Sequence, residues 1–124
     1  MGSSANRQVF ETYLTAWSAM STEERRAVLE QTVSSDIQYF DAMARLSGRD
    51  ALAAHLAGFQ QRRPNYSFSL AHYLQHSDAV LANWLMQDDS GKIVVRGYDS
   101  IRLDDFGRIA SIVGFSDIPA QSGG

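Results

Sequence analysis

The chain of 124 residues contains no cysteine. This absence excludes disulfide bonds, thiolate metal sites and thiol nucleophiles. The three histidines are His55, His72 and His76, and no two of them form a His-x-His pair. Because transition metals in proteins are usually held by clusters of cysteine and histidine, we expect no metal site and a protein that works without a cofactor.

Positive charge is also scarce. Lys92 is the only lysine, and 11 basic residues face 14 acidic ones, which gives a formal net charge of −3. The chain therefore lacks the basic stripe that is typical of nucleic-acid-binding proteins. We expect no nucleic-acid partner.

Long hydrophobic runs are missing as well. No apolar stretch is long enough to span a bilayer, and the segment Met1–Arg7 has no apolar signal core. We expect no membrane association and a cytoplasmic location. The length and the hydrophobic content of 44% suit one globular domain over residues 1–124, with flexible ends at 1–5 and 120–124.

The first half of the chain has the periodicity of helices. An amphipathic helix is predicted over Asn6–Met20, because its apolar residues recur with the spacing of one helix face. Ser21 and Glu24 then form a capping box that starts a second helix. A third helix is predicted to begin at residue 49 or 50 and to end before Pro64.

The other segments alternate like β-strands. A short strand is predicted at Ile37–Asp41, and four consecutive strands follow at 66–75, 79–87, 92–103 and 108–117. Helices followed by an antiparallel meander imply an α+β fold, with three N-terminal helices packed on one face of a curved, mainly antiparallel sheet. A pocket can form between the helices and such a sheet.

One carboxylate lies in the middle of an apolar strand face. Side chains alternate along a strand, so Asp99 shares its face with Val95, Gly97, Ile101 and Leu103. A carboxylate in such a place is costly unless it is paired, protonated, hydrated or functional. Asp99 is therefore the strongest candidate for a site residue.

Further polar side chains fall on the predicted inner faces, namely Tyr13, Asp41, His55, His72 and Asp117. Each has a structural alternative, as a satisfied core residue, a turn-stabilising aspartate or the end of a strand. Together, two carboxyl groups and a phenol in an apolar cavity suit proton transfer beside a carbonyl group. One carboxylate can abstract the proton, while the phenol and a protonated acid bind the enolate oxygen.

Aromatic and polar side chains on the same faces would line the pocket. We expect a ligand to contact Trp17, Phe59, His72, Trp84, Phe115 and Asp117. The opposite face of the sheet is unusually apolar for a solvated surface. It is predicted to carry Tyr73, Leu81, Leu85, Tyr98 and Ile112 beside Arg96 and Arg102, so we expect a homodimer through the sheet.

Three segments of the chain resemble the NTF2-like superfamily, in particular its SnoaL-like and ketosteroid isomerase branches. They are the opening helices from Tyr13 to Val33, the stretch Ile37–Asp41 with Gly48–Leu52, and Tyr98–Ile109 with its Asp-x-x-x-Φ-x-x-x-Gly-x-Ile pattern. The resemblance implies a cone-shaped α+β barrel that is commonly dimeric. It does not settle the function, because the superfamily contains isomerases, cyclases, dehydratases and non-catalytic binding proteins.

The same resemblance implies roles for three residues. Tyr13, Asp41 and Asp99 fall where ketosteroid isomerases carry a tyrosine donor, an aspartate base and an aspartic acid. The supporting tyrosines of that branch are absent, and His55 stands where an apolar residue is usual. SnoaL-like cyclases use an aspartate with a nearby histidine or asparagine, which Asp99 with His55 or His72 would also fit.

Two hypotheses follow from the sequence. The first is a cofactor-free acid/base enzyme of the isomerase, cyclase or dehydratase type, acting on a small hydrophobic carbonyl compound through Asp99, Asp41, Tyr13 and His55. The alternative is a non-catalytic module of the same fold that binds a small ligand or acts as a dimeric interaction domain.

Overall fold

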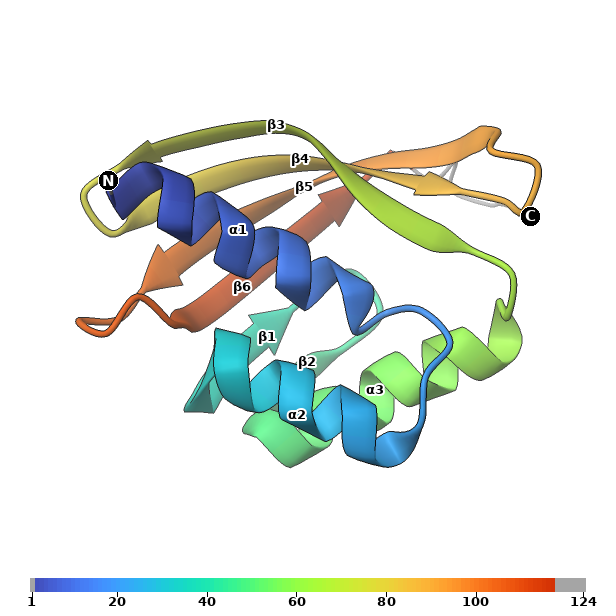
Figure 1. The fold of residues 1–124 in the computed structure, drawn as a ribbon, viewed down its shortest axis with the longest axis horizontal. Coiled ribbons are helices and arrows are strands. Elements are labelled where there is room, and N and C mark those ends of the chain that lie inside the picture. Colours follow the sequence, from blue (N-terminus) through green and yellow to red (C-terminus); the bar gives the residue numbers. More distant parts are fainter. Residues whose placement is uncertain (1, 118–124) are drawn as a thin grey trace.

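The computed structural model of the protein describes residues 2–117, and three helices and six strands form its fold (Figure 1). In chain order the elements are α1 (Gly2–Thr15), α2 (Thr22–Thr32), β1 (Val33–Phe40), β2 (Arg45–Ser47), α3 (Arg49–Arg62), β3 (Ser67–His76), β4 (Ala79–Gln87), β5 (Ile93–Leu103) and β6 (Ile109–Ser116). Helix α1 begins earlier and ends earlier than the sequence predicts. The flexibility predicted for residues 120–124 concerns a segment outside the described residues.

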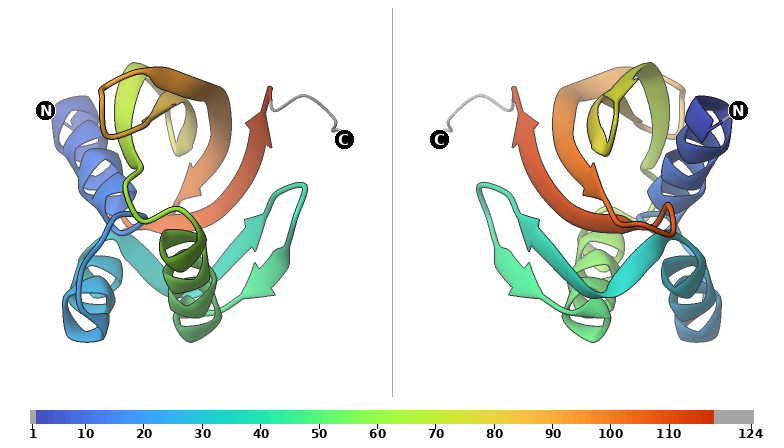
Figure 2. Two further views of the ribbon diagram at one scale, coloured as in Figure 1. Left: turned by 90° about the vertical axis from the view of Figure 1, so that its right-hand side faces the viewer. Right: turned by 90° about the vertical axis from the view of Figure 1, so that its left-hand side faces the viewer.

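The six strands form one curved sheet in the order β2-β1-β6-β5-β4-β3. Strand β1 runs parallel to β6, and all other neighbours are antiparallel. The side views show how strongly the sheet curls, yet it stays open between its edge strands (Figure 2). Helices α2 and α3 pack on β1, and α1 packs on α2 and β3. The predicted α+β fold is confirmed.

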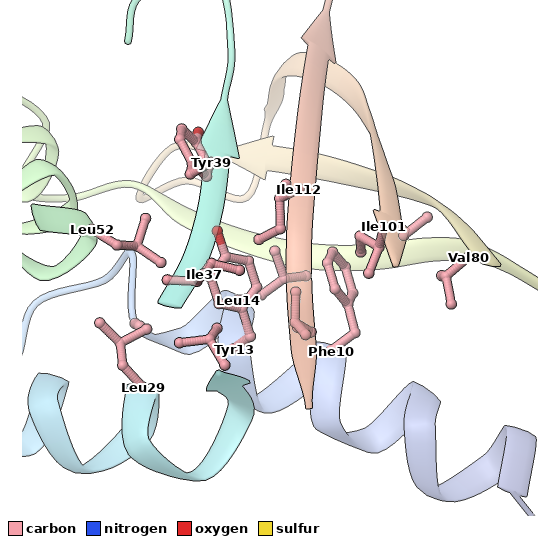
Figure 3. Close-up of a cluster of buried hydrophobic side chains, with 14 of the residues drawn as sticks. Phe10, Tyr13, Leu14, Leu29, Ile37, Tyr39, Leu52, Val80, Ile101 and Ile112 are labelled. Atoms are coloured by element: carbon pink, nitrogen blue, oxygen red, sulfur yellow. The ribbon is translucent and has the colours of Figure 1, made fainter. Parts of the chain in front are cut away.

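The core fills the space between the helices and the inner face of the sheet. Figure 3 shows side chains from α1, α2, α3 and four of the strands meeting there, with Tyr13 and Tyr39 among them. The largest fully buried side chains in this core are those of Phe10, Tyr13, Leu29, Ile37, Leu52, Leu56, Ile101, Ile109 and Ile112. Among residues 2–117, no helix is long and apolar enough to cross a membrane.

A buried arginine fixes the end of α1. Helix α1 ends at Thr15, and the chain then continues in turns. Backbone carbonyl groups at this end therefore lack helical hydrogen-bond partners. Arg25 of α2 is only 4% exposed and donates from Nε to the Ala16 carbonyl and from NH2 to the Ser18 carbonyl, each at 2.9 Å. These bonds hold the turn that contains Trp17. The predicted capping box of Ser21 and Glu24 is present at the start of α2.

A β-bulge in β3 corrects the predicted position of His72. Leu70 pairs with Trp84 and His72 with Asn83, so one residue of β3 has no counterpart in β4. An extra residue reverses the alternation of side chains beyond it. His72 is therefore exposed, whereas Tyr73, predicted on the outer face, packs against the core.

A second bulge corrects the predicted inner face of β6. Arg102 pairs with Ser111 and Leu103 with Ile109, so one extra residue lies between the two paired positions of β6. Ile109 and Ile112 are both buried, and every later side chain changes side. Phe115 is 59% exposed and Asp117 is exposed, so neither lines the interior. Ile112, predicted on the outer face, belongs to the core.

The buried bonds of Arg25 generate a stability prediction. Arg25→Met leaves two carbonyl groups without donors, which should lower the free energy of unfolding by about 1–3 kcal/mol in urea denaturation. Arg26→Met is the matched control, because Arg26 makes only an exposed contact of 3.4 Å with Asp50. It should cost less than about 1 kcal/mol. Equal losses in the two variants would contradict the assigned role.

Candidate functional site

Asp99 lies on the buried face of β5, as its alternation predicts. Gly97, Ile101 and Leu103 are buried on the same side, and Asp99 itself is 7% exposed. The indole Nε1 of Trp84 on the neighbouring strand donates to Asp99 Oδ1 at 3.1 Å. Among residues 2–117, no cation forms a salt bridge with Asp99. This carboxyl group is therefore held by a neutral donor in an apolar setting.

The surroundings of Asp99 favour its protonated form. Burial raises its pKa, the hydrogen bond from Trp84 opposes the rise, and the negative charge of Asp41 adds to it, which gives a pKa of about 7. An aspartic acid that keeps its proton near neutrality can donate a hydrogen bond, which an ordinary aspartate cannot do.

Asp41 has the opposite environment. It directly follows β1, and its Oδ1 accepts hydrogen bonds from the backbone N–H groups of Met43 at 2.8 Å and Ala44 at 2.9 Å. The hydroxyl of Tyr39 donates a short hydrogen bond to Oδ2. His55 Nε2 lies 3.9 Å from the same oxygen, which is longer than a hydrogen bond.

These donors keep Asp41 ionised. Burial acts to raise the pKa of Asp41, but His55, Tyr39 and the two backbone N–H groups outweigh it and hold the pKa at about 2. Because the His55 contact is long, the three direct donors give most of this stabilisation. Below about pH 7 the site therefore combines one carboxylate, Asp41, with one carboxylic acid, Asp99.

A glycine on β6 lets the two acids approach each other. Asp99 pairs with Gly114 across the sheet. A Cβ atom at Gly114 would lie 3.2 Å from Asp99 Oδ1 and 3.4 Å from Asp41 Cβ. Both acids therefore border the space that a side chain would occupy at this position.

Tyr13 completes the polar group from the side of α1. It is fully buried, and the indole Nε1 of Trp17 donates to its hydroxyl oxygen at 3.1 Å. Burial raises the pKa of Tyr13 well above its ordinary value, and the negative charge of Asp99 adds to the rise. The hydroxyl therefore stays protonated and can serve as a hydrogen-bond donor.

Four rings, here called the aromatic cluster, pack beside these polar groups. The cluster consists of Trp17, Phe59, Phe68 and Trp84, whose neighbouring rings have centroids 5.2–5.6 Å apart. The His55 ring also contacts Trp17, at 5.9 Å. Such tilted and edge-to-face contacts are favourable ring arrangements.

Two cavities in the described part of the chain lie away from the aromatic cluster. One of about 340 Å³ is lined by α2 and the start of α3, including Arg26 and Gly48. The other, of about 180 Å³, lies between α1 and the end of α2, at Val9 and Thr32. Beside Asp99 lies the Trp84 indole, and Phe68 packs against it.

Most of the predicted site residues converge. Tyr13, Asp41, His55 and Asp99 meet at one end of the core, and Trp17, Phe59 and Trp84 border them. His72, Phe115 and Asp117 point away because of the two bulges. Sequence reasoning did not assign Tyr39 or Phe68 to the site. Tyr39 was recognisable, since it alternates with Ile37 and Asp41 on the predicted first strand.

A comparison with known protein families shows to which family the chain belongs. A sequence model of the SnoaL-like domain family matches residues 10–112. The chain belongs to the SnoaL-like family. The expected membership of the NTF2-like superfamily is thereby confirmed. Among curated proteins, no sequence matches this SnoaL-like chain.

Solved structures share the SnoaL-like fold along most of the chain. A proposed isomerase of the SnoaL-like family from Agrobacterium tumefaciens strain C58 has 29% identity and a TM-score of 0.85, and the match covers 93% of this chain and 99% of that one. A proposed SnoaL-like polyketide cyclase from Jannaschia sp. CCS1 has 16% identity and a TM-score of 0.74, with 93% and 87% covered. A protein with a ketosteroid isomerase-like fold from Catenulispora acidiphila, solved with trimethylamine, has 15% identity and a TM-score of 0.70, with 86% and 83% covered.

The raised pKa of Asp99 predicts how the stability of this SnoaL-like protein depends on pH. Since the pKa in the folded state, about 7, lies above the ordinary 3.8, the folded state binds the proton more tightly than the unfolded state. The stability contributed by this proton is present at low pH and is lost as pH rises through 7. One pKa unit corresponds to roughly 1.4 kcal/mol, and the slope falls as pH approaches the folded-state pKa, so raising the pH from 5 to 7 should lower the free energy of unfolding by about 2 kcal/mol.

Urea denaturation at pH 5, 6, 7 and 8 checks this prediction. Asp99→Asn should remove the decrease, because an amide does not titrate. Asp105→Asn, at an exposed position of the β5–β6 turn, should keep it. If the Asp99→Asn and wild-type curves stay parallel, Asp99 is not the group responsible.

Proposed function

We propose that this SnoaL-like protein is a cofactor-free acid/base enzyme of the isomerase, cyclase or dehydratase type, with a small hydrophobic carbonyl compound as substrate. The observation that carries the proposal is the pair of carboxyl groups beside Gly114, which differ in protonation because burial favours the acid form of Asp99 whereas hydrogen-bond donors favour the anion of Asp41. Groups with separated pKa values in one buried site are typical of acid/base catalysis. The proposed activities of the Agrobacterium and Jannaschia proteins support the same class of reaction.

The chemistry begins with removal of a proton from the carbon next to the carbonyl group. Asp41 takes this proton as the base, and the electron pair of the broken C–H bond moves into an enolate. Asp99 and Tyr13 donate hydrogen bonds to the enolate oxygen, where the negative charge develops. Return of the proton from Asp41 to another carbon completes an isomerisation. In a cyclisation the enolate carbon would instead attack a second carbonyl carbon, whose C=O π electrons move onto oxygen, and the proton held by Asp41 would pass to that new alkoxide.

The aromatic cluster supports an apolar and flat substrate. A molecule that reaches Asp99 must lie against Trp17, Phe59, Phe68 or Trp84, and it must take over contacts that these rings now make with one another. A planar, hydrophobic compound replaces such contacts best, since it offers the rings a similar surface. Polar sugars or phosphate esters would leave their groups without partners here.

A second candidate function is a binding module without catalysis. The observation that favours it is the direct packing of the four rings on one another, next to the Trp84 hydrogen bond to Asp99. Such a protein would bind a hydrophobic ligand but would not exchange its protons. Binding and turnover therefore have to be measured separately.

Exchange of α-protons in deuterated water tests the enzymatic proposal without knowledge of the natural substrate. A panel of cyclic and aromatic ketones, including β,γ-unsaturated ones, is incubated with the protein and followed by proton NMR. The wild type should accelerate deuterium incorporation, and Asp41→Asn should reduce the rate about 10²–10⁴-fold because the base is lost.

Two further variants sharpen this experiment. Asp99→Asn should also slow the exchange, since it removes the acid proton, whereas Asp105→Asn should keep the wild-type rate. Ligand binding is followed in parallel through the fluorescence of the two tryptophans. Ketones that bind without any accelerated exchange would favour the binding module and refute catalysis.

We also propose that the protein forms a homodimer through the outer face of the sheet. A row of paired residues crosses five strands there, from Phe40 through Val113, Ser100 and Leu81 to Leu74. Phe40, Leu81 and Leu74 of this row are exposed apolar side chains. Tyr98 and Phe115 form a second pair beside this row. A large apolar patch of this kind is commonly covered by a partner.

The mass in solution tests the dimer. Sedimentation equilibrium of the wild type should give twice the chain mass of 13.7 kDa. Leu81→Arg introduces a charge beside Ser100 and Leu74 within this row and should give the single-chain mass. Phe106→Arg, on the exposed β5–β6 turn away from the sheet face, should stay dimeric. A monomeric wild type would rule the proposal out.

A further inference from the structure

Trp84 owes its position to a glycine on the next strand. The two residues Trp84 and Gly97 pair across β4 and β5. A Cβ atom at Gly97 would lie 2.1 Å from Cζ2 and 2.4 Å from Cη2 of the Trp84 ring, a distance at which no side chain fits. Gly97 lies outside the left-handed backbone conformations that favour glycine. The glycine is needed at this point for space, so that the indole can lie across β5.

The indole that lies over Gly97 reaches the buried acid. Its Nε1–H donates to Asp99 Oδ1 at 3.1 Å. An indole N–H can only donate, so Oδ1 must act as the acceptor in this hydrogen bond. In a carboxylic acid the carbonyl-type oxygen is the better acceptor. The contact therefore favours Oδ1 as the carbonyl oxygen and leaves Oδ2 as the oxygen that carries the proton.

The second tryptophan of the chain acts in the same way on Tyr13. Trp17 Nε1 donates to the Tyr13 hydroxyl oxygen at 3.1 Å, which leaves the hydroxyl hydrogen free to donate elsewhere. Asp99 and Tyr13, the two groups proposed to donate to an enolate oxygen, thus each accept a hydrogen bond from an indole N–H. Phe68 packs against both indole rings.

We infer that Trp84, placed over Gly97, is a positioning residue that fixes the acid proton of Asp99 on Oδ2, from which it can be donated to the substrate oxygen. Only the last step of this inference, donation of the Asp99 proton to a substrate oxygen, rests on the proposed function. The titratable groups that face Asp99 are Tyr13 from α1, Tyr39 from β1 and Asp41 directly after β1, and His55 of α3 contacts Asp41.

The hydrogen bond can be observed without any substrate. In ¹H–¹⁵N NMR spectra the chain gives two indole N–H signals, from Trp17 and Trp84, which are assigned with Trp17→Phe and Trp84→Phe. The Trp84 signal should shift as pH rises through the titration of Asp99, followed independently by its ¹³C carboxyl signal. Both shifts should persist in His55→Gln, and the indole shift should vanish in Asp99→Asn.

Trp84→Phe separates the hydrogen bond from packing, because phenylalanine keeps a ring against Phe68 but has no N–H group. The Asp99 carboxyl signal should titrate at higher pH than in the wild type, since the hydrogen bond from Trp84 lowers its pKa. With a ketone that the wild type exchanges, kcat should fall about tenfold with little change in KM. Two results would overturn the inference. One is an Asp99 titration that is the same in Trp84→Phe as in the wild type, and the other is a wild-type Trp84 indole signal that does not shift while Asp99 titrates.

Gly97→Ala tests the need for space. Alone it should displace the indole and abolish the pH response of the Trp84 signal, or prevent folding. In a Trp84→Ala background the same change should have little further effect on stability, because the ring it would meet is gone. Equal effects of Gly97→Ala in the two backgrounds would refute the role of Gly97. Since these measurements need no turnover, a protein that exchanges no ketone would refute the proposed function while leaving the hydrogen bond from Trp84 to Asp99 established.

Discussion

Burial of the Asp99 carboxyl group on an apolar strand face is the constraint on which the rest of the site depends. A charged carboxylate in that place would be costly, and no cation among residues 2–117 forms a salt bridge with it. The acid can be accommodated because it keeps its proton and meets one neutral donor, the Trp84 indole. That donor in turn requires the open space over Gly97. Three residues on two strands thus form a single arrangement.

The contrast between the two acids comes from the backbone around them. Asp99 lies inside a strand, where the N–H groups are already used in the sheet. Asp41 lies just beyond the end of β1, where the turn presents the free N–H groups of Met43 and Ala44 to its carboxylate. The same type of side chain therefore becomes an acid at one place and an anion at the other. Because Gly114 has no side chain, Asp99 and Asp41 border the same space. In the proposed reaction the acid and the anion can therefore act on the same substrate molecule.

Local patterns in the sequence were sufficient for most of the fold and for the centre of the site. The capping box at Ser21 and the alternation around Asp99 depend on neighbouring residues only, and both are confirmed. The bulges in β3 and β6 were not predictable in this way, since no glycine or proline marks either position. One extra residue was enough to turn His72 and Phe115 outwards. The contact of Trp84 with Asp99 depends on strand register, which a single strand does not reveal.

Closure by aromatic rings also bears on how the proposed chemistry would work. Hydrogen bonds to a developing enolate stabilise it most when water is absent, because water competes for the same donors and screens the charge. Asp99 and Tyr13 are 7% and 0% exposed beside the aromatic cluster, so their donor groups are shielded from water. A flat substrate that replaces ring contacts by its own surface preserves this dry environment during the reaction. The apolar packing and the unusual protonation of Asp99 are therefore two results of one arrangement, since the rings that exclude water also keep the acid neutral.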